Sequence, residues 1–149
     1  MSLAKTIDGD IKSAMLQKKK EDLTALRGIK AAILLAQTES GATKELSGDD
    51  EIKLLSKMAK QRKDSAEIYT TQNRADLAEK ELQELEVINR YLPKQLSTED
   101  VEAEVRSIIA DTGAESMKDM GKVMGIASKK LAGMTDGKTI SAIVKKLLG

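Results

Sequence analysis

Eight residues near the C-terminal end of the chain have the types and spacing expected of a surface that binds a phosphate backbone. Five are lysines and three are glycines: Lys118, Lys122, Lys129, Lys130, Lys138, Gly121, Gly125 and Gly137. Lysine ammonium groups contact phosphate oxygens, and a glycine allows another molecule to approach a helix backbone closely. Because a glycine inside a helix costs about 1 kcal/mol relative to alanine, Gly121 and Gly125 require an explanation.

A helical projection of this segment separates a basic stripe from an apolar one. Lys118, Lys122 and Lys129 lie together with Gly125, and Gly121 lies between the two stripes. The apolar stripe, which we expect to face the core, consists of Met117, Met120, Met124, Ala127 and Leu131. Two interpretations of the glycines follow. They serve close helix–helix packing, which the residues alone favour, or they form a shelf for a phosphate backbone.

The segment MTDGK supplies a second candidate for anion binding. Asp136 is predicted to cap the last helix, with Gly137 and Lys138 at its start. Free amides and the positive end of the helix dipole favour an anion at such a position. Taken alone, the segment is weak evidence for an anion site, because most such turns are only helix caps.

Histidine and cysteine are absent from the chain. The sequence therefore excludes thiol nucleophiles, histidine general bases, disulfides and the metal sites that depend on these residues. We predict no catalytic residue, no metal and no cofactor, and a carboxylate-rich turn is interpreted as surface charge (Glu79, Glu81, Glu84 and Glu86). The two aromatic residues, Tyr69 and Tyr91, do not provide a platform for stacking bases.

Composition indicates a charged helical protein without a membrane span. Of the 149 residues, 33% are charged, and the longest apolar runs are far shorter than the roughly 18 residues that a span requires. The N-terminal segment has no apolar stretch of the kind found in secretory signals. We therefore expect a cytoplasmic location, no membrane partner and no small-molecule substrate.

Hydrophobic periodicity predicts an all-α fold with two domains. Four helices are expected in residues 1–92, over about 3–18, 20–38, 48–71 and 74–91. Their apolar stripes are predicted to include Met15, Leu34, Ile68 and Leu82. Pro93, the single proline, stops the fourth helix, so we place the domain boundary between residues 92 and 93.

The C-terminal domain, residues 93–149, is predicted to be a small three-helix bundle. Its helices begin near Ser97, Ser116 and Asp136, and the first ends at Gly113. Charge is divided unevenly along it. One arginine against five acidic residues gives −4 over residues 97–112, and seven lysines against three acidic residues give +4 over residues 113–149. The near-neutral total of the chain therefore conceals a basic segment.

Several separated motifs resemble the YqeY family of small bacterial proteins. These are KQRKDSAEIY, NRADLAEKELQELEVINRYLPKQLS, DTGAESMKDMGKVMG and DGKTISAIVKKLL, which together extend over almost the whole chain. The segment from about residue 97 onward also resembles the tail domain of GatB, the tRNA-handling subunit of Glu/Asp-tRNA amidotransferase. The resemblance implies an N-terminal helical domain followed by a three-helix domain that helps to hold tRNA.

Carried onto this chain, the resemblance implies a non-catalytic tRNA-associated module, with tRNA or a tRNA-handling enzyme as partner. The matching positions are Lys118, Gly121, Lys122, Gly125, Gly137 and Lys138. Similarity alone would also suggest a carbon–nitrogen ligase that uses glutamine as amide donor. However, nothing here resembles the amidase or the domain that activates the carboxylate, so we expect no autonomous activity. A protein–protein adaptor and an accessory subunit of an amidotransferase are the alternatives.

Overall fold

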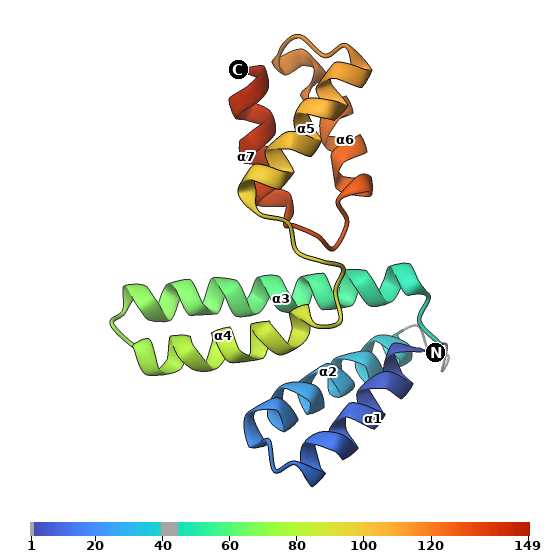
Figure 1. The fold of residues 1–149 in the computed structure, drawn as a ribbon, viewed down its shortest axis with the longest axis vertical. Helices are drawn as coiled ribbons and strands as arrows, with labels where there is room; N and C mark the ends of the chain where they lie inside the picture. The colour runs from blue at the N-terminus through green and yellow to red at the C-terminus, as the bar shows by residue number, and fades with distance from the viewer. Residues whose placement is uncertain (1, 40–44) are drawn as a thin grey trace. The chain divides into compact units, whose positions relative to one another are not determined.

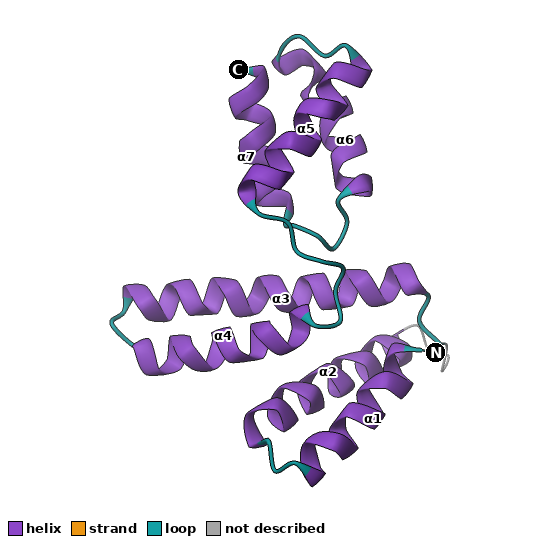
Figure 2. Cartoon of the chain, viewed as in Figure 1, coloured by secondary structure: helices purple, strands orange, loops and turns teal. Residues whose placement is uncertain are grey.

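The computed structural model describes residues 2–39 and 45–149 and confirms the all-α prediction. Within these ranges it contains seven α-helices, one short 3₁₀ turn and no strand (Figures 1 and 2). The chain divides into two compact units, Met1–Leu92 and Pro93–Gly149.

Two helical hairpins form the first unit. Helices α1 (Leu3–Leu16) and α2 (Lys20–Glu39) pack against each other, as do α3 (Gly48–Thr71) and α4 (Ala75–Asn89) (Figure 1). Helix α2 also packs on α4 and joins the two hairpins. Ser47 caps α3 by accepting a hydrogen bond from the amide of Asp50 at 3.1 Å, which fixes the start of this long helix.

The core of this unit lies at one end of the α3–α4 hairpin. Ile7, Ile29, Leu55 and Ile88 are almost fully buried there, one from each helix. The prediction that Met15, Leu34, Ile68 and Leu82 face the core is wrong, because all four side chains are exposed. The α3 and α4 residues in this core come from the first half of α3 and the last part of α4. Ile68 and Leu82 are therefore outside it.

The second unit consists of α5 (Thr98–Thr112), a 3₁₀ turn (Met117–Asp119), α6 (Met120–Lys130) and α7 (Gly137–Leu148). Each helix contributes one apolar face to a common core, in which Val101, Val105, Val123 and Val144 are fully buried. The segment before α5 is held to the α6–α7 connection by the amide of Leu96, which donates to the carbonyl of Met134 at 2.9 Å. These contacts close the bundle.

Side chains and glycine mark the helix ends in this unit. Ser97 caps α5 by accepting a hydrogen bond from the amide of Asp100, and Asp136 caps α7 by accepting one from Thr139 at 2.7 Å. Gly113 ends α5 in the left-handed conformation, with φ of 70°. A residue with a Cβ atom is disfavoured in this conformation, whereas glycine is not.

Replacing Gly113 with alanine is expected to destabilise the protein by about 1 kcal/mol. A Cβ atom at this position would meet no atom within 4 Å, so the loss would come from backbone conformation alone. Urea unfolding followed by circular dichroism measures it. Gly113→Asn is the matched control and should lose less, because asparagine tolerates positive φ. An alanine variant as stable as the parent would contradict this account.

Candidate nucleic-acid interface

The buried face of helix α6 overlaps the predicted methionine stripe but is centred on Val123. Val123 and Ala127 are fully buried, and Leu131, which follows the helix, is 2% exposed. Met120 and Met124 are half-buried beside them, and Met117 is 45% exposed. The predicted core stripe is therefore correct for Ala127 and Leu131, peripheral for two methionines and wrong for Met117.

The reason lies in how this segment begins. Ser116, where a helix start was predicted, forms a capping box with Asp119, in which Asp119 accepts from the amides of Glu115 and Ser116. The turn that it starts is a 3₁₀ turn, which has about three residues per turn rather than 3.6. A projection at a constant 100° therefore misplaces Met117 relative to α6. Such a projection centres the predicted apolar stripe on the methionines, whereas Val123 is at the centre of the buried face.

Gly121 and Gly125 lie on the exposed side of α6. A Cβ atom built at either position would meet no atom within 4 Å, and the same is true of Gly137 at the start of α7. Among the described residues of the second unit, no neighbouring helix therefore approaches these glycines. Packing between helices of this unit therefore does not explain the two glycines. Their cost in helix stability has no cause within the unit.

All five candidate lysines are exposed, but they differ in their partners. The ammonium group of Lys130 lies 2.9 Å from the carboxylate of Glu104 on α5. Among residues 2–39 and 45–149, no ion pair involves the other four, which are Lys118, Lys122, Lys129 and Lys138. Four lysines of the candidate set are thus available to an external anion.

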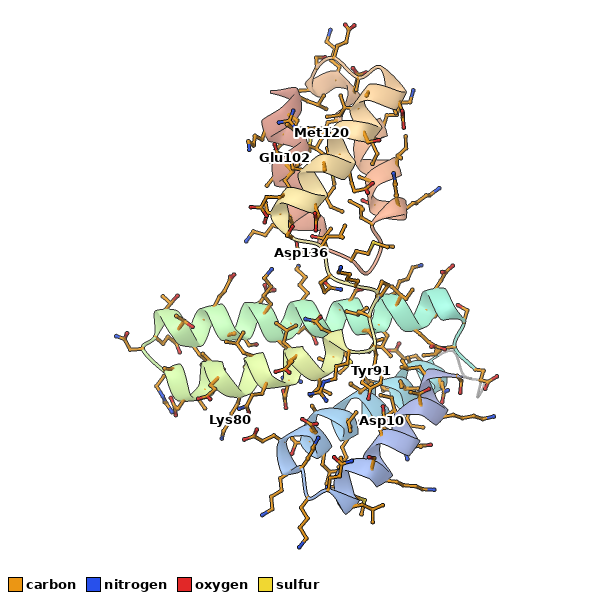
Figure 3. All side chains as sticks on the ribbon, viewed as in Figure 1. Asp10, Lys80, Tyr91, Glu102, Met120 and Asp136 are labelled. Atoms are coloured by element: carbon orange, nitrogen blue, oxygen red, sulfur yellow. The ribbon has the colours of Figure 1, made fainter. Side chains whose placement is uncertain are left out.

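Part of the charge separation seen along the sequence is neutralised across the bundle. Glu102 on α5 accepts from Arg106 at 2.8 Å and lies 3.4 Å from the ammonium group of Lys146 on α7 (Figure 3). These hydrogen bonds, to Arg106 first and Lys146 second, lower the pKa of Glu102. Together with the Lys130–Glu104 pair, they direct two of the seven lysines of this segment toward α5. The basic surface is smaller than the sequence total indicates.

Asp136 occupies the position that the sequence offered to an anion. Its carboxylate already accepts the amide of Thr139 in the first turn of α7. A second anion at the same helix start would be repelled by this carboxylate. Lys138 therefore contributes through its exposed ammonium group, while the start of α7 is not an anion site of its own.

One feature of the α6 surface escaped the sequence analysis. Ile126 is 39% exposed, although it is a large apolar residue in the middle of a helix. It lies four residues after Lys122 and three before Lys129, so it shares their face. The sequence already indicated this exposure, because Ile126 is next to Gly125 and lies outside the predicted apolar stripe. The exposed face of α6 thus combines lysines, two open glycines and one apolar side chain.

The first unit has an open pocket of about 360 Å³ between the end of α4 and the α1–α2 hairpin. The hydroxyl of Tyr91 donates to the carboxylate of Asp10, and the guanidinium of Arg90 lies 3.1 Å from the carboxylate of Asp22 (Figure 3). These polar groups pair with one another and hold α4 to the hairpin. We interpret the pocket as part of the packing contact between the end of α4 and the α1–α2 hairpin rather than as a ligand site.

Comparison with known proteins places the chain in a family. A model of the YqeY family, described as Yqey-like protein, matches residues 4–148. The chain belongs to the YqeY family. This membership extends through both helical units.

Curated relatives of this family member carry the name "Altered inheritance of mitochondria protein 41, mitochondrial". The protein from Meyerozyma guilliermondii is 35% identical over 127 residues, which cover 83% of this chain and 66% of the relative. The Clavispora lusitaniae protein is 37% identical over 91 residues, covering 61% and 52%. The chain therefore spans between about half and two thirds of the length of these relatives.

The prediction of a cytoplasmic location is wrong when set against these relatives, because each is named a mitochondrial protein. The prediction rested on the lack of apolar segments, and such a composition does not distinguish one aqueous compartment from another. The structure adds that none of the helices in its described ranges is long and apolar enough to cross a bilayer.

Replacing Gly121 or Gly125 with alanine is expected to stabilise the protein by about 0.5–1 kcal/mol each. Both positions are helical and have room for a Cβ atom, so the gain in helix propensity should appear undiminished. Urea unfolding of the single and double variants measures it. A loss of stability would show that these glycines have a structural role that the open surroundings do not reveal.

The ionisation of Tyr91 provides a test of the packing contact between α4 and the α1–α2 hairpin. Burial, the hydrogen bond to Asp10 and the charge of that carboxylate raise the pKa of Tyr91 above its ordinary value of 10.0. The hydroxyl should therefore ionise at higher pH in the folded state than in the unfolded state. The free energy of unfolding that the neutral hydroxyl contributes should then decrease as the pH rises above 10.0, the ordinary pKa of tyrosine. Tyrosinate absorbance in a Tyr69→Phe background reports Tyr91 alone. Adding Asp10→Asn should lower its pKa, and an unchanged titration would contradict the pairing.

Proposed function

We propose that this chain is a non-catalytic module that docks on the backbone of tRNA through the exposed face of α6. The observation that carries the proposal is the open surroundings of Gly121 and Gly125, where nothing in the described structure explains the glycines. An external backbone that approaches the helix closely would explain them. Lys122 and Lys129 are exposed along the same face of α6, Lys118 is exposed in the 3₁₀ turn that precedes it, and these lysines can reach around such a backbone.

The chemistry of this face favours contact with phosphates over the reading of bases. Lysine ammonium groups are compact point charges that contact phosphate oxygens in many orientations. Neither tyrosine lies in the second unit, so this face has no aromatic side chain on which an exposed base could stack. The proposed module therefore recognises the shape and charge of tRNA, and its sequence preference is low.

A protein partner is the second candidate, and the exposure of Ile126 and Met117 supports it. These two apolar side chains, together with the open glycines, would suit an incoming amphipathic helix. A tRNA-handling enzyme is a partner of this kind, in which case the chain would be an accessory subunit without activity of its own. This function differs from the first in its dependence on salt and on apolar contacts.

Binding of unfractionated tRNA to the full chain distinguishes the two candidates. Four lysine–phosphate contacts give a slope near −3 in a plot of log affinity against log salt. Affinity should therefore fall between about fiftyfold and about a hundredfold from about 50 to about 200 mM salt. Fluorescence anisotropy of end-labelled tRNA measures this change.

Variants locate the interface within the chain. Replacing Lys118, Lys122 and Lys129 with glutamate should abolish binding at the higher salt concentration. Replacing Lys53, Lys57 and Lys60, which are exposed on α3, is the matched control with the same change in charge. Gly125→Leu should weaken binding without loss of stability, because it fills the shelf. If tRNA does not bind at low salt, or if the control variant loses as much affinity, the tRNA proposal fails.

A further inference from the structure

The end of the α1–α2 hairpin exposes apolar side chains that its own unit does not cover. Leu16, the last residue of α1, is 85% exposed, and Met15 beside it is 55% exposed. Sequence periodicity assigned Met15 to the core, yet only Ala14 at this end of α1 is buried. Leucine at the surface is common, but two adjacent apolar side chains at the turn of a hairpin form a small protruding apolar tip.

Lysines surround this tip. Lys18, Lys19 and Lys20 follow Leu16 after one residue, and all three are exposed. Lys12 lies one helical turn before Leu16, on the same face of α1. In the parts of the chain that the structure describes, none of these four lysines takes part in an ion pair. With Glu21 as the only acidic residue in 12–21, four lysines against one glutamate give this segment a net charge of +3.

We infer that this tip docks on the surface of an anionic lipid bilayer. Leu16 and Met15 would enter the boundary between headgroups and acyl chains, while the lysines remain at the level of the lipid phosphates. An anionic surface matches the positive charge of the tip, and the apolar boundary matches its exposed side chains. This inference is independent of the proposed tRNA interface, which lies on a different helix in the second unit.

A bilayer suits the tip better than a nucleic acid does. A phosphate backbone would engage the lysines but would leave Leu16 and Met15 in water, with no apolar surface to cover them. A lipid surface engages both kinds of side chain at once. The expectation of no membrane partner was based on the lack of a spanning helix, and docking at the surface requires none.

Binding of this kind should be weak, reversible and sensitive to charge. Each lysine near an anionic membrane contributes about a fivefold increase in partitioning, so the three consecutive lysines together contribute about a hundredfold. Salt should weaken the interaction, because the charges are exposed to solvent. These magnitudes suit vesicle titrations of the full chain.

Tryptophan placed at the tip provides a direct readout, since the chain contains none. In Leu16→Trp, fluorescence should shift to shorter wavelength on addition of phosphatidylcholine vesicles containing about one third phosphatidylserine, and should stay unchanged with phosphatidylcholine alone. Leu35→Trp is the matched control, because Leu35 is exposed at the other end of α2 and should give no shift. A shift at both positions, or at neither, would overturn the inference.

Flotation of the unlabelled protein with the same vesicles tests the lysines. Replacing Lys18, Lys19 and Lys20 with glutamate should reduce binding by at least a hundredfold, whereas the Lys53, Lys57 and Lys60 variant should retain it. Leu16→Ser should also weaken binding, and circular dichroism checks that each variant remains folded. Equal binding to neutral vesicles would overturn the inference. So would a tip variant that loses tRNA binding while the parent shows no vesicle binding, because the lysines would then belong to an RNA site.

Discussion

In the second unit, the constraint on which the rest depends is that three short helices around one core can each bury only one face. Val101, Val123 and Val144 occupy the centre of that core, and their burial determines how each helix is rotated about its axis. Once Val123 faces inward, the residues on the opposite side of α6 face outward. The exposure of Lys122, Gly125 and Lys129 is therefore a consequence of how the core packs.

Electrostatic contacts then divide the lysines into two groups. Those that lie near α5, Lys130 and Lys146, pair with Glu104 and Glu102. The pairs are exposed to solvent, so each adds little to stability. These pairs matter because they determine which lysines of the bundle keep an unpaired positive charge. They offset part of the negative charge of α5 and leave the lysines on the outer face of α6 without an ionic partner in the described structure.

The sequence was sufficient to predict the elements of the fold, because their ends carry strong local signals. Ser97 and Asp136 lie at helix starts as expected, and Gly113 adopts the left-handed conformation that ends α5. Prediction of which apolar residues are buried was less successful. Periodicity finds an apolar stripe but not how far along the helix the common core extends, so Ile68 was assigned to a core cluster that does not include it. The 3₁₀ turn before α6 likewise changed the phase of its residues in a way that a uniform helix cannot anticipate.

At the candidate site too, sequence alone identified the residues but not their surroundings. Sequence identified the lysines and glycines by type and spacing, but it could not decide between packing and binding, because both use glycines at i and i+4. Membership of the YqeY family does not decide between them either, since a structural glycine and a binding glycine look alike in a family pattern. The structure adds the empty space around the Cβ positions of Gly121 and Gly125, which depends on where the other helices of the unit lie. No helix of the second unit occupies that space, and this observation supports the proposal that the glycines serve a molecule outside the chain.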